Sequence, residues 1–130
     1  MGFTLTELLI VVIIIGIVAT LALPMLVKTI EKAKLGEAAN NLNLIRTGQK
    51  IYFLEYSTFA PSIDWLNIEN PKNNVNRYFE YNITSPLAVP PNANDFTARA
   101  TRSGGPSPYS TYYYEITKSG DITSNGPLRP

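Results

Sequence analysis

The sequence contains no cysteine and no histidine among its 130 residues. These absences exclude a disulfide framework, a thiol nucleophile, a serine–histidine catalytic pair and the common zinc sites. Charge is also scarce, because only 16% of the residues are Asp, Glu, Lys or Arg and the formal net charge is +1. A nearly neutral chain gives no electrostatic reason to expect nucleic acid as a partner. We therefore expect neither an enzyme nor a bound cofactor.

Charge is missing altogether from residues 8–27, which read LLIVVIIIGIVATLALPMLV. As a helix, these residues would extend about 30 Å, which is the thickness of the hydrocarbon core of a bilayer. A cleaved secretory signal would have a shorter apolar stretch between a basic start and a small-residue cleavage site. A core helix that is apolar on every side would need more protein around it than this chain provides. We therefore predict that this run spans a membrane.

Glu7 stands at the edge of the apolar run. A carboxylate drawn into the bilayer would cost about 2.5–3.5 kcal/mol on insertion scales. Two hypotheses follow for this side chain. It either lies solvated among the lipid headgroups without a function, or it pairs with a positive charge inside an assembly, for which the α-amino group of another chain is a candidate.

Residues 2–10 read GFTLTELLI, and with the apolar run and Pro24 they resemble the amino terminus of type IV pilins and of type II secretion pseudopilins. The resemblance implies that a prepilin peptidase cuts between Gly2 and Phe3, and that the new amino terminus of Phe3 is methylated. It also implies that Glu7 pairs with the amino terminus of a neighbouring subunit. Pro24 corresponds to the family's helix-bending proline.

Gly16 and Pro24 mark the place where a long helix is easiest to break or kink. Proline lacks the backbone donor and crowds the carbonyl four residues earlier, which belongs to Thr20, and glycine is a poor helix former. Membrane helices also tolerate such residues without any functional reason. By resemblance, the stretch 16–24 unwinds when pilin subunits assemble.

An amphipathic helix is predicted to continue the membrane run. Between residues 25 and 60 there is no proline, and apolar residues recur at helical spacing along one face. The members of this stripe are Ile30, Leu35, Ala38, Leu42, Ile45, Tyr52 and Tyr56. The charged residues mostly off the stripe are Lys28, Glu31, Lys32, Arg46 and Lys50.

Nine of the ten prolines lie from Pro61 onward, so the chain changes there to short elements and turns. Alternating apolar residues predict strands over 77–84, 96–101 and 111–117, and a turn at 118–121 leads into a short fourth strand at 122–123. Loops are expected at 85–94 and 103–108. The predicted class is α+β, with a pilin-like long N-terminal helix packed on an antiparallel sheet of about four strands.

These elements suggest a division of the chain. Residues 1–2 are expected to be the remainder of a leader, and residues 3–27 a transmembrane and polymerisation helix. Residues 28–130 would form a globular pilin domain, with a helix over 28–57 and a β-rich region over 58–130.

Asp121 and Asn125 are weak candidates for calcium ligands. Calcium takes six to eight oxygens, several of them usually carboxylate, whereas this loop offers one carboxylate. A turn is the favoured interpretation, and no metal site is predicted.

The other chemically suggestive residues also have structural interpretations. Alternation sends Tyr113 to the side opposite Tyr112 and Tyr114, which favours sheet packing over a continuous stacking surface. Arg99 and Arg102 are weak evidence for DNA contact on a neutral protein. The acidic residues of the β-rich region are scattered singly, which argues against acid–base catalysis.

We therefore predict a structural subunit of a type IV pilus-like helical filament, assembled through the N-terminal hydrophobic helix. The alternatives are a pseudopilin of a type II secretion system and, from another class, a single-span membrane-anchored extracytoplasmic ligand-binding domain. Expected partners are further copies of the chain, a prepilin peptidase, an inner-membrane assembly platform and, before assembly, the lipid bilayer. The expected location is the inner (cytoplasmic) membrane and then an extracellular pilus or a periplasmic pseudopilus.

Overall fold

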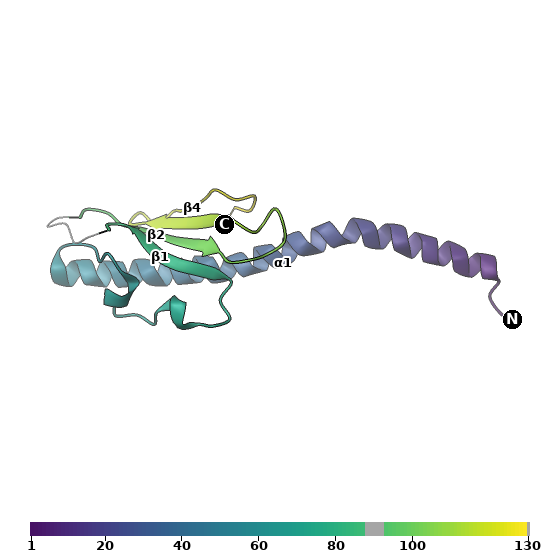
Figure 1. The fold of residues 1–130 in the computed structure, drawn as a ribbon, viewed down its shortest axis with the longest axis horizontal. Coiled ribbons are helices and arrows are strands. Elements are labelled where there is room, and N and C mark those ends of the chain that lie inside the picture. Colours follow the sequence, from purple (N-terminus) through teal and green to yellow (C-terminus); the bar gives the residue numbers. More distant parts are fainter. Residues whose placement is uncertain (88–92, 130) are drawn as a thin grey trace. The chain divides into compact units, whose positions relative to one another are not determined.

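The computed structural model describes residues 1–87 and 93–129. In this part of the chain the elements follow one another as α1 (Leu5–Tyr56), two 3₁₀ turns, η1 (Ile63–Trp65) and η2 (Pro71–Asn73), and the strands β1 (Phe79–Ser85), β2 (Thr97–Arg102), β3 (Tyr113–Thr117) and β4 (Ile122–Ser124) (Figure 1). The chain divides into two compact units, Met1–Ala33 and Lys34–Pro130. Helix α1 therefore contributes residues to both units.

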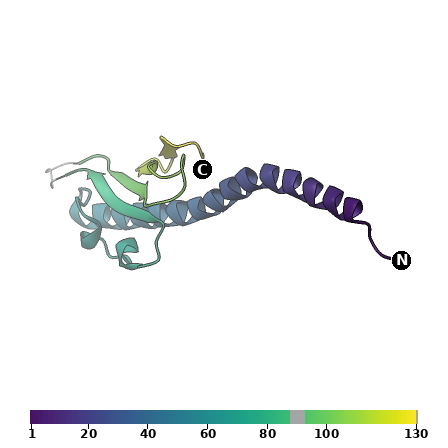
Figure 2. The same cartoon turned by 45° about the vertical axis from the view of Figure 1, so that its right-hand side comes forward.

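The second unit contains a four-stranded antiparallel sheet in the order β1-β2-β3-β4. Each strand lies beside the strand that precedes it in sequence, as Figure 2 shows for the successive arrows. In the register, Tyr81 faces Ala100 and Ala100 faces Tyr114. The predicted α+β class and antiparallel sheet are confirmed, and each predicted strand lies within two residues of an observed one.

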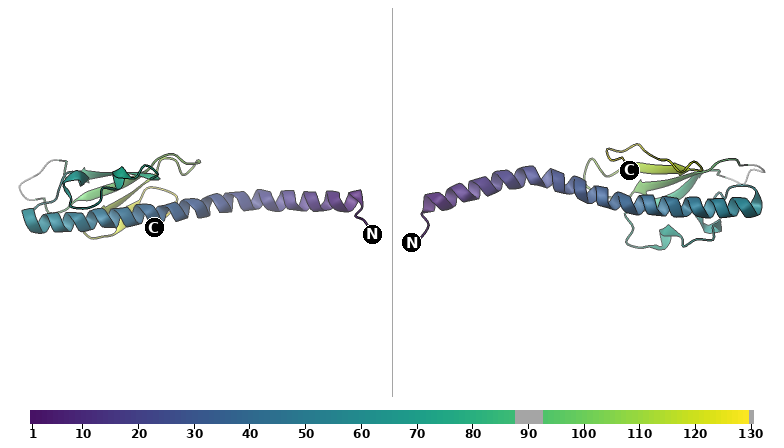
Figure 3. Two further views of the ribbon diagram at one scale, coloured as in Figure 1. Left: turned by 90° about the horizontal axis from the view of Figure 1, so that it is seen from below. Right: turned by 180° about the vertical axis from the view of Figure 1, so that it is seen from behind.

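The core of the second unit lies between one face of the sheet and residues 34–56 of α1, which run along that face (Figure 3). Strand residues alternate between buried and more accessible positions, which are mostly exposed in β1 and half-buried in β2, as the period of two requires. The buried strand-side residues are Phe79, Tyr81, Ile83, Phe96, Ala98, Ala100, Tyr112, Tyr114 and Ile116. The helix covers them with Leu35, Ala38, Leu42 and Ile45.

The predicted helical stripe is correct at its centre and wrong at both ends. Ile30 is 45% exposed and Tyr56 is 60% exposed. Tyr56 ends the helix, and the chain turns away at Ser57, whose φ of 55° is left-handed. Glu31, expected off the stripe, is only 1% exposed, and Gln49, which was not predicted to be buried, is completely buried.

Gln49 is buried because its amide replaces the water that the backbone of Ala60 would otherwise bind. Its Nε2 donates to the Ala60 carbonyl and its Oε1 accepts from the Ala60 amide, each at 2.8 Å. A buried polar side chain is stable in a core when its hydrogen-bonding groups are paired, as both ends of this amide are. This pair of bonds fastens the segment after α1 to the helix.

The segment between α1 and the sheet also packs closely at Gly48. A Cβ at this position would lie 2.9 Å from Cγ2 of Ile68 and 3.2 Å from Cβ of Leu66. The glycine therefore permits a close approach between the helix and the returning chain.

The loop expected at 103–108 is confirmed, and Gly104 and Gly105 adopt φ values of 71° and 121° there. Of the loop expected at 85–94, residues 88–92 lie outside the described residues, as does Pro130.

Candidate assembly site at the amino terminus

Helix α1 begins with a reciprocal pair of hydrogen bonds between Thr4 and Glu7. The Thr4 amide donates to Oε2 of Glu7 at 2.9 Å, and the Glu7 amide donates to Oγ1 of Thr4 at 3.3 Å. This is a capping box, which satisfies two of the backbone amides that a helix start leaves unpaired. Thr4 was not predicted as a site residue, although the T-x-x-E spacing of residues 4–7 signals this cap.

The cap holds the Glu7 carboxylate at the first turn of the helix and uses only one of its two oxygens. In the described part of the chain, the one bond to this side chain goes to Oε2, and Glu7 forms no ion pair. Because the residue is exposed, Oε1 can accept a hydrogen bond from a group outside the chain. A carboxylate placed in this way suits a cation brought by another molecule.

Gly2 and Phe3 precede the helix and lie beside Glu7. A shallow pocket of about 270 Å³ is lined by Met1, Gly2, Phe3 and Glu7. The structure therefore brings three predicted site residues together. Phe3 is 90% exposed, so the Gly2–Phe3 peptide bond lies on accessible chain outside regular structure.

The helix that follows has an apolar surface with no cover inside the first unit. An 18-residue window has a mean hydropathy of 3.0, and none of it is buried. Leu8, Ile13 and Val18 illustrate this, since each is more than half exposed. By length and composition this helix can cross a membrane. Exposed apolar surface costs about 25 cal/mol per Å² in water, so this surface requires lipid or other helices around it.

Gly16 and Pro24 lie inside α1, which is helical through both positions. Pro24 cannot donate to the Thr20 carbonyl because proline has no N–H. The Thr20 hydroxyl donates instead to the Gly16 carbonyl at 2.8 Å. A Cβ at Gly16 would meet nothing within 4 Å, so the backbone there is unconstrained by neighbours.

The two weak calcium candidates are not brought together. Asp121 and Asn125 flank β4 at opposite ends, about 13 Å apart along an extended strand. Asp121 bonds with Ser119, and Oδ1 of Asn125 accepts from the Tyr113 amide at 2.7 Å. In residues 1–87 and 93–129 no group of three or more acidic residues could hold a metal ion.

The tyrosine and arginine candidates on the sheet have structural roles. Tyr112 and Tyr114 are buried, whereas Tyr113 lies on the opposite face beneath the Arg99 guanidinium, 3.9 Å from its ring centre. Arg99 also pairs with Glu115 across β2 and β3 at 2.8 Å. Arg102 is buried and donates to the carbonyls of Tyr78 and Ser103.

Comparison with known proteins supports the resemblance of this chain to the type IV pilin family. Over 65 residues the sequence is 49% identical to the type IV major pilin protein PilA of Myxococcus xanthus. The match covers 48% of this chain and 30% of that protein, so the chain matches less than a third of the relative's length. No family model matches the chain, and no solved structure matches it.

Proposed function

We propose that this chain, a relative of a type IV major pilin, is a structural subunit of a type IV pilus-like helical filament and not an enzyme. The observation that carries the proposal is the 49% identity to that pilin. The uncovered apolar helix and the exposed carboxylate at its start support it. The relative is a major pilin, which favours a pilus over a pseudopilus or a membrane-anchored receptor domain.

Before assembly, the apolar part of α1 would anchor the subunit in the cytoplasmic membrane. Lipid chains and a bundle of apolar helices are nearly equivalent surroundings for such a surface. A subunit can therefore leave the bilayer for the filament without exposing its helix to water. Identical helices from other copies, delivered by an assembly platform in the membrane, would replace the lipid in an extracellular pilus.

Processing would create the cation that Glu7 lacks. Cleavage between Gly2 and Phe3 by a prepilin peptidase converts a peptide nitrogen into an amino group on Phe3, which remains charged after N-methylation. Glu7 of one subunit would pair with this group on the next. Among apolar helices the attraction is much stronger than in water, and a carboxylate left without a partner there is costly. The pairing would therefore fix how neighbouring helices align along the filament.

The stretch 16–24 would give the assembled helix its extensibility. The missing bond at Pro24 and the low helix propensity of Gly16 make this the least costly place to open. Extended chain rises about 3.3 Å per residue against 1.5 Å in a helix, so opening lengthens the subunit.

Replacing Glu7 tests the proposal in cells. Glu7→Gln keeps an oxygen that can cap Thr4 but removes the charge, and Thr4→Ser is the matched control because serine preserves the cap. We expect both variants to reach the membrane in normal amounts. The sheared, sedimentable filament fraction should fall about tenfold or more for Glu7→Gln, since the loss of one such pair exceeds the 1.4 kcal/mol of a tenfold change.

Two outcomes would contradict the proposal at different levels. Normal filament yield from Glu7→Gln would remove the pairing role and leave Glu7 as a helix cap. Complete absence of the unaltered chain from sheared filaments, seen by electron microscopy and by antibody, would overturn the assignment as a filament subunit.

A further inference from the structure

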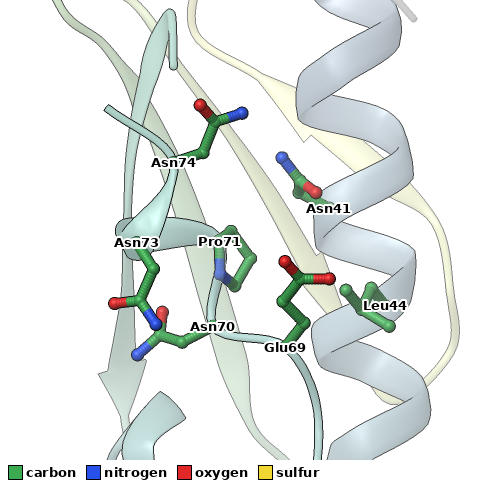
Figure 4. A pocket seen from close by; sticks show the side chains of 7 residues that line it. All are labelled: Asn41, Leu44, Glu69, Asn70, Pro71, Asn73 and Asn74. Atoms are coloured by element: carbon green, nitrogen blue, oxygen red, sulfur yellow. The ribbon is translucent and has the colours of Figure 1, made fainter. Parts of the chain in front are cut away.

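A polar pocket of about 350 Å³ lies in the second unit, between α1 and the segment that carries η2 (Figure 4). Its size is at the lower end of the range for small-molecule sites. Four of its seven lining residues are asparagines, and one is a glutamate. The lining residues are Asn41, Leu44, Glu69, Asn70, Pro71, Asn73 and Asn74.

The wall of the pocket opposite α1 is held in place by its own hydrogen bonds. Pro71 is buried, and Oδ1 of Asn70 accepts from the Lys72 amide at 3.0 Å, which caps η2. Arg77 donates through Nη1 to the carbonyls of Lys72 and Asn74 at 2.9 and 3.1 Å. The pocket therefore exists before any ligand arrives, which reduces the ordering cost of binding.

The orientation of the Asn41 amide is determined by Tyr81. The Tyr81 hydroxyl donates to Glu37 at 3.1 Å, so it must accept from Nδ2 of Asn41, at 2.9 Å. Burial, and to a lesser degree the Glu37 carboxylate beside it, raises the pKa of Tyr81 well above its usual value, which keeps the hydroxyl protonated. Oδ1 of Asn41 is consequently left as an acceptor for the pocket.

The other side chains of the pocket add both hydrogen-bond acceptors and donors. Oδ1 of Asn74 accepts from the Asn76 amide at 3.0 Å, which leaves the Nδ2 group of Asn74 to donate. Glu69 has no hydrogen bond or ion pair within residues 1–87 and 93–129, and Figure 4 shows its carboxylate directed toward Asn41. Asn73 offers a complete amide, with one acceptor and two donor hydrogens.

This set of groups selects against anions and against calcium. The lining contains no cationic side chain to hold an anion, and one carboxylate is too few for the oxygen cage that calcium requires. Hydroxyl groups suit the pocket better, because each donates and accepts at once. Leu44 and Pro71 provide apolar contacts for the C–H bonds of a small ring.

We propose that this pocket binds one neutral hexose unit, with adjacent hydroxyls donating to Glu69 and Asn41 and accepting from the amides of Asn73 and Asn74. The site does not depend on the assembly of filaments. Binding can therefore be measured on the single subunit, and its failure would leave the filament proposal intact.

The test is NMR titration of the full chain in phosphocholine micelles, since a detergent with a sugar headgroup would compete. The probes are D-glucose, D-galactose, D-mannose and N-acetyl-D-glucosamine, each to about 50 mM, well above the ~1 mM dissociation constant of a weak ligand. We expect at least one sugar to shift the side-chain amide signals of Asn73 and Asn74 saturably. If none of the four does so, the proposal is overturned.

Variants identify the chemistry of the ligand. Asn73→Ala should weaken binding of the responding sugar about fivefold or more, while Asn43→Ala, on the same helix but outside the pocket, should leave it unchanged. Glu69→Gln should weaken a neutral sugar only a few-fold, because the glutamine oxygen still accepts. Spermidine is the competing probe, and saturable shifts with spermidine but no sugar would overturn the proposal in favour of an ammonium site.

A final arm separates two sources of the hexose. The methyl glycoside of the responding sugar represents a residue linked in a glycan, and the reducing sugar represents a free metabolite. Equal affinity for both assigns the pocket to terminal residues of glycans, whereas a loss of tenfold or more with the glycoside assigns it to free sugar. Either result supports a hexose site.

Discussion

The two parts of α1 have the same backbone and opposite relations to the rest of the chain. In the first unit the apolar residues from Leu8 to Leu26 are exposed in the single molecule, and no part of the most apolar window is buried. In the second unit a narrow stripe beginning at Leu35 is buried under the sheet, and the opposite face is polar or exposed. One helix can therefore lie in two different surroundings, an apolar one for its first part and the sheet and water for its second. The helix satisfies its own backbone hydrogen bonds in both, so the side chains determine which surroundings each part requires.

The largest expected effect comes from separating the two regions. Deleting residues 1–27 removes the uncovered apolar surface and leaves the stripe that the sheet requires. We expect the shortened chain to stay in solution without detergent and to keep the β-sheet, as seen by circular dichroism. Aggregation, or loss of the sheet signal, would show that the anchor belongs to the core of the second unit.

The division of α1 and the positions of the strands could be predicted from the sequence because both depend on the pattern of apolar residues. A charge-free run, a helical stripe with a period near 3.6 and strands with a period of two all reflect one physical rule, the removal of apolar side chains from water. Buried polar contacts follow no such period. Gln49 could not be assigned to the core from its type, because only the position of Ala60 after the chain reverses makes the amide a good partner.

Glycines and pockets are equally dependent on tertiary contacts. Gly36 and Gly48 are both helical glycines in the sequence, and only the packing of Ile68 and Leu66 distinguishes them. The hexose pocket joins residue 41 to residues near 70, a juxtaposition that no local pattern predicts. The capping box was different, because the spacing of Thr4 and Glu7 contained its signal.

Removing the Gln49 amide should lower the stability of the second unit and leave the first unit unaffected. Gln49→Ala leaves the Ala60 N–H and carbonyl buried without their partners, at a cost of about 1–3 kcal/mol for each. We expect the free energy of unfolding of the second unit to fall by about 2–6 kcal/mol, the sum of the two costs. The measurement is urea unfolding of the full chain in detergent, followed by the fluorescence of Trp65.

Two controls locate that effect. Asn43→Ala removes an exposed amide that bonds within the same helix, and should change the unfolding free energy by less than about 0.5 kcal/mol. Thr20→Val removes the hydroxyl bond to Gly16 in the first region and should leave the same transition unmoved. A Gln49→Ala effect no larger than these would show that water replaces the amide at Ala60.

High pH should destabilise the second region through Tyr81. The pKa of Tyr81 is raised in the folded protein, chiefly by burial, so above about pH 10 the unfolded chain loses a proton that the folded chain keeps. The stabilising contribution is complete below pH 10 and falls as pH rises further, by at most about 1.4 kcal/mol per pH unit.

Tyr81→Phe isolates this contribution from the other tyrosines. The variant loses the bonds to Glu37 and Asn41, so it starts less stable by about 1 kcal/mol near pH 8. Its unfolding free energy should then fall less steeply than that of the unaltered chain between pH 10 and pH 11.5. Parallel curves would mean that Tyr81 ionises as readily in the folded protein as in the unfolded one.

The smallest expected effect comes from one substitution made in both regions. A Cβ would meet nothing within 4 Å at Gly16 or at Gly36, so alanine fits at either position. Gly36→Ala should raise the free energy of unfolding of the second unit by about 0.5–1 kcal/mol, because alanine is the better helix former.

Gly16→Ala should leave that free energy unchanged in the single chain. A helix in a membrane or micelle keeps its backbone hydrogen bonds, so the better helix propensity of alanine has no unfolding step to act on there. It would instead oppose the opening of residues 16–24 in the filament. We therefore expect Gly16→Ala filaments to form but to extend less under a pulling force than Gly36→Ala filaments. Equal extension of the two kinds of filament would show that the helix does not unwind at Gly16. A fall in the unfolding free energy of Gly36→Ala would show that an added Cβ meets a neighbour at residue 36.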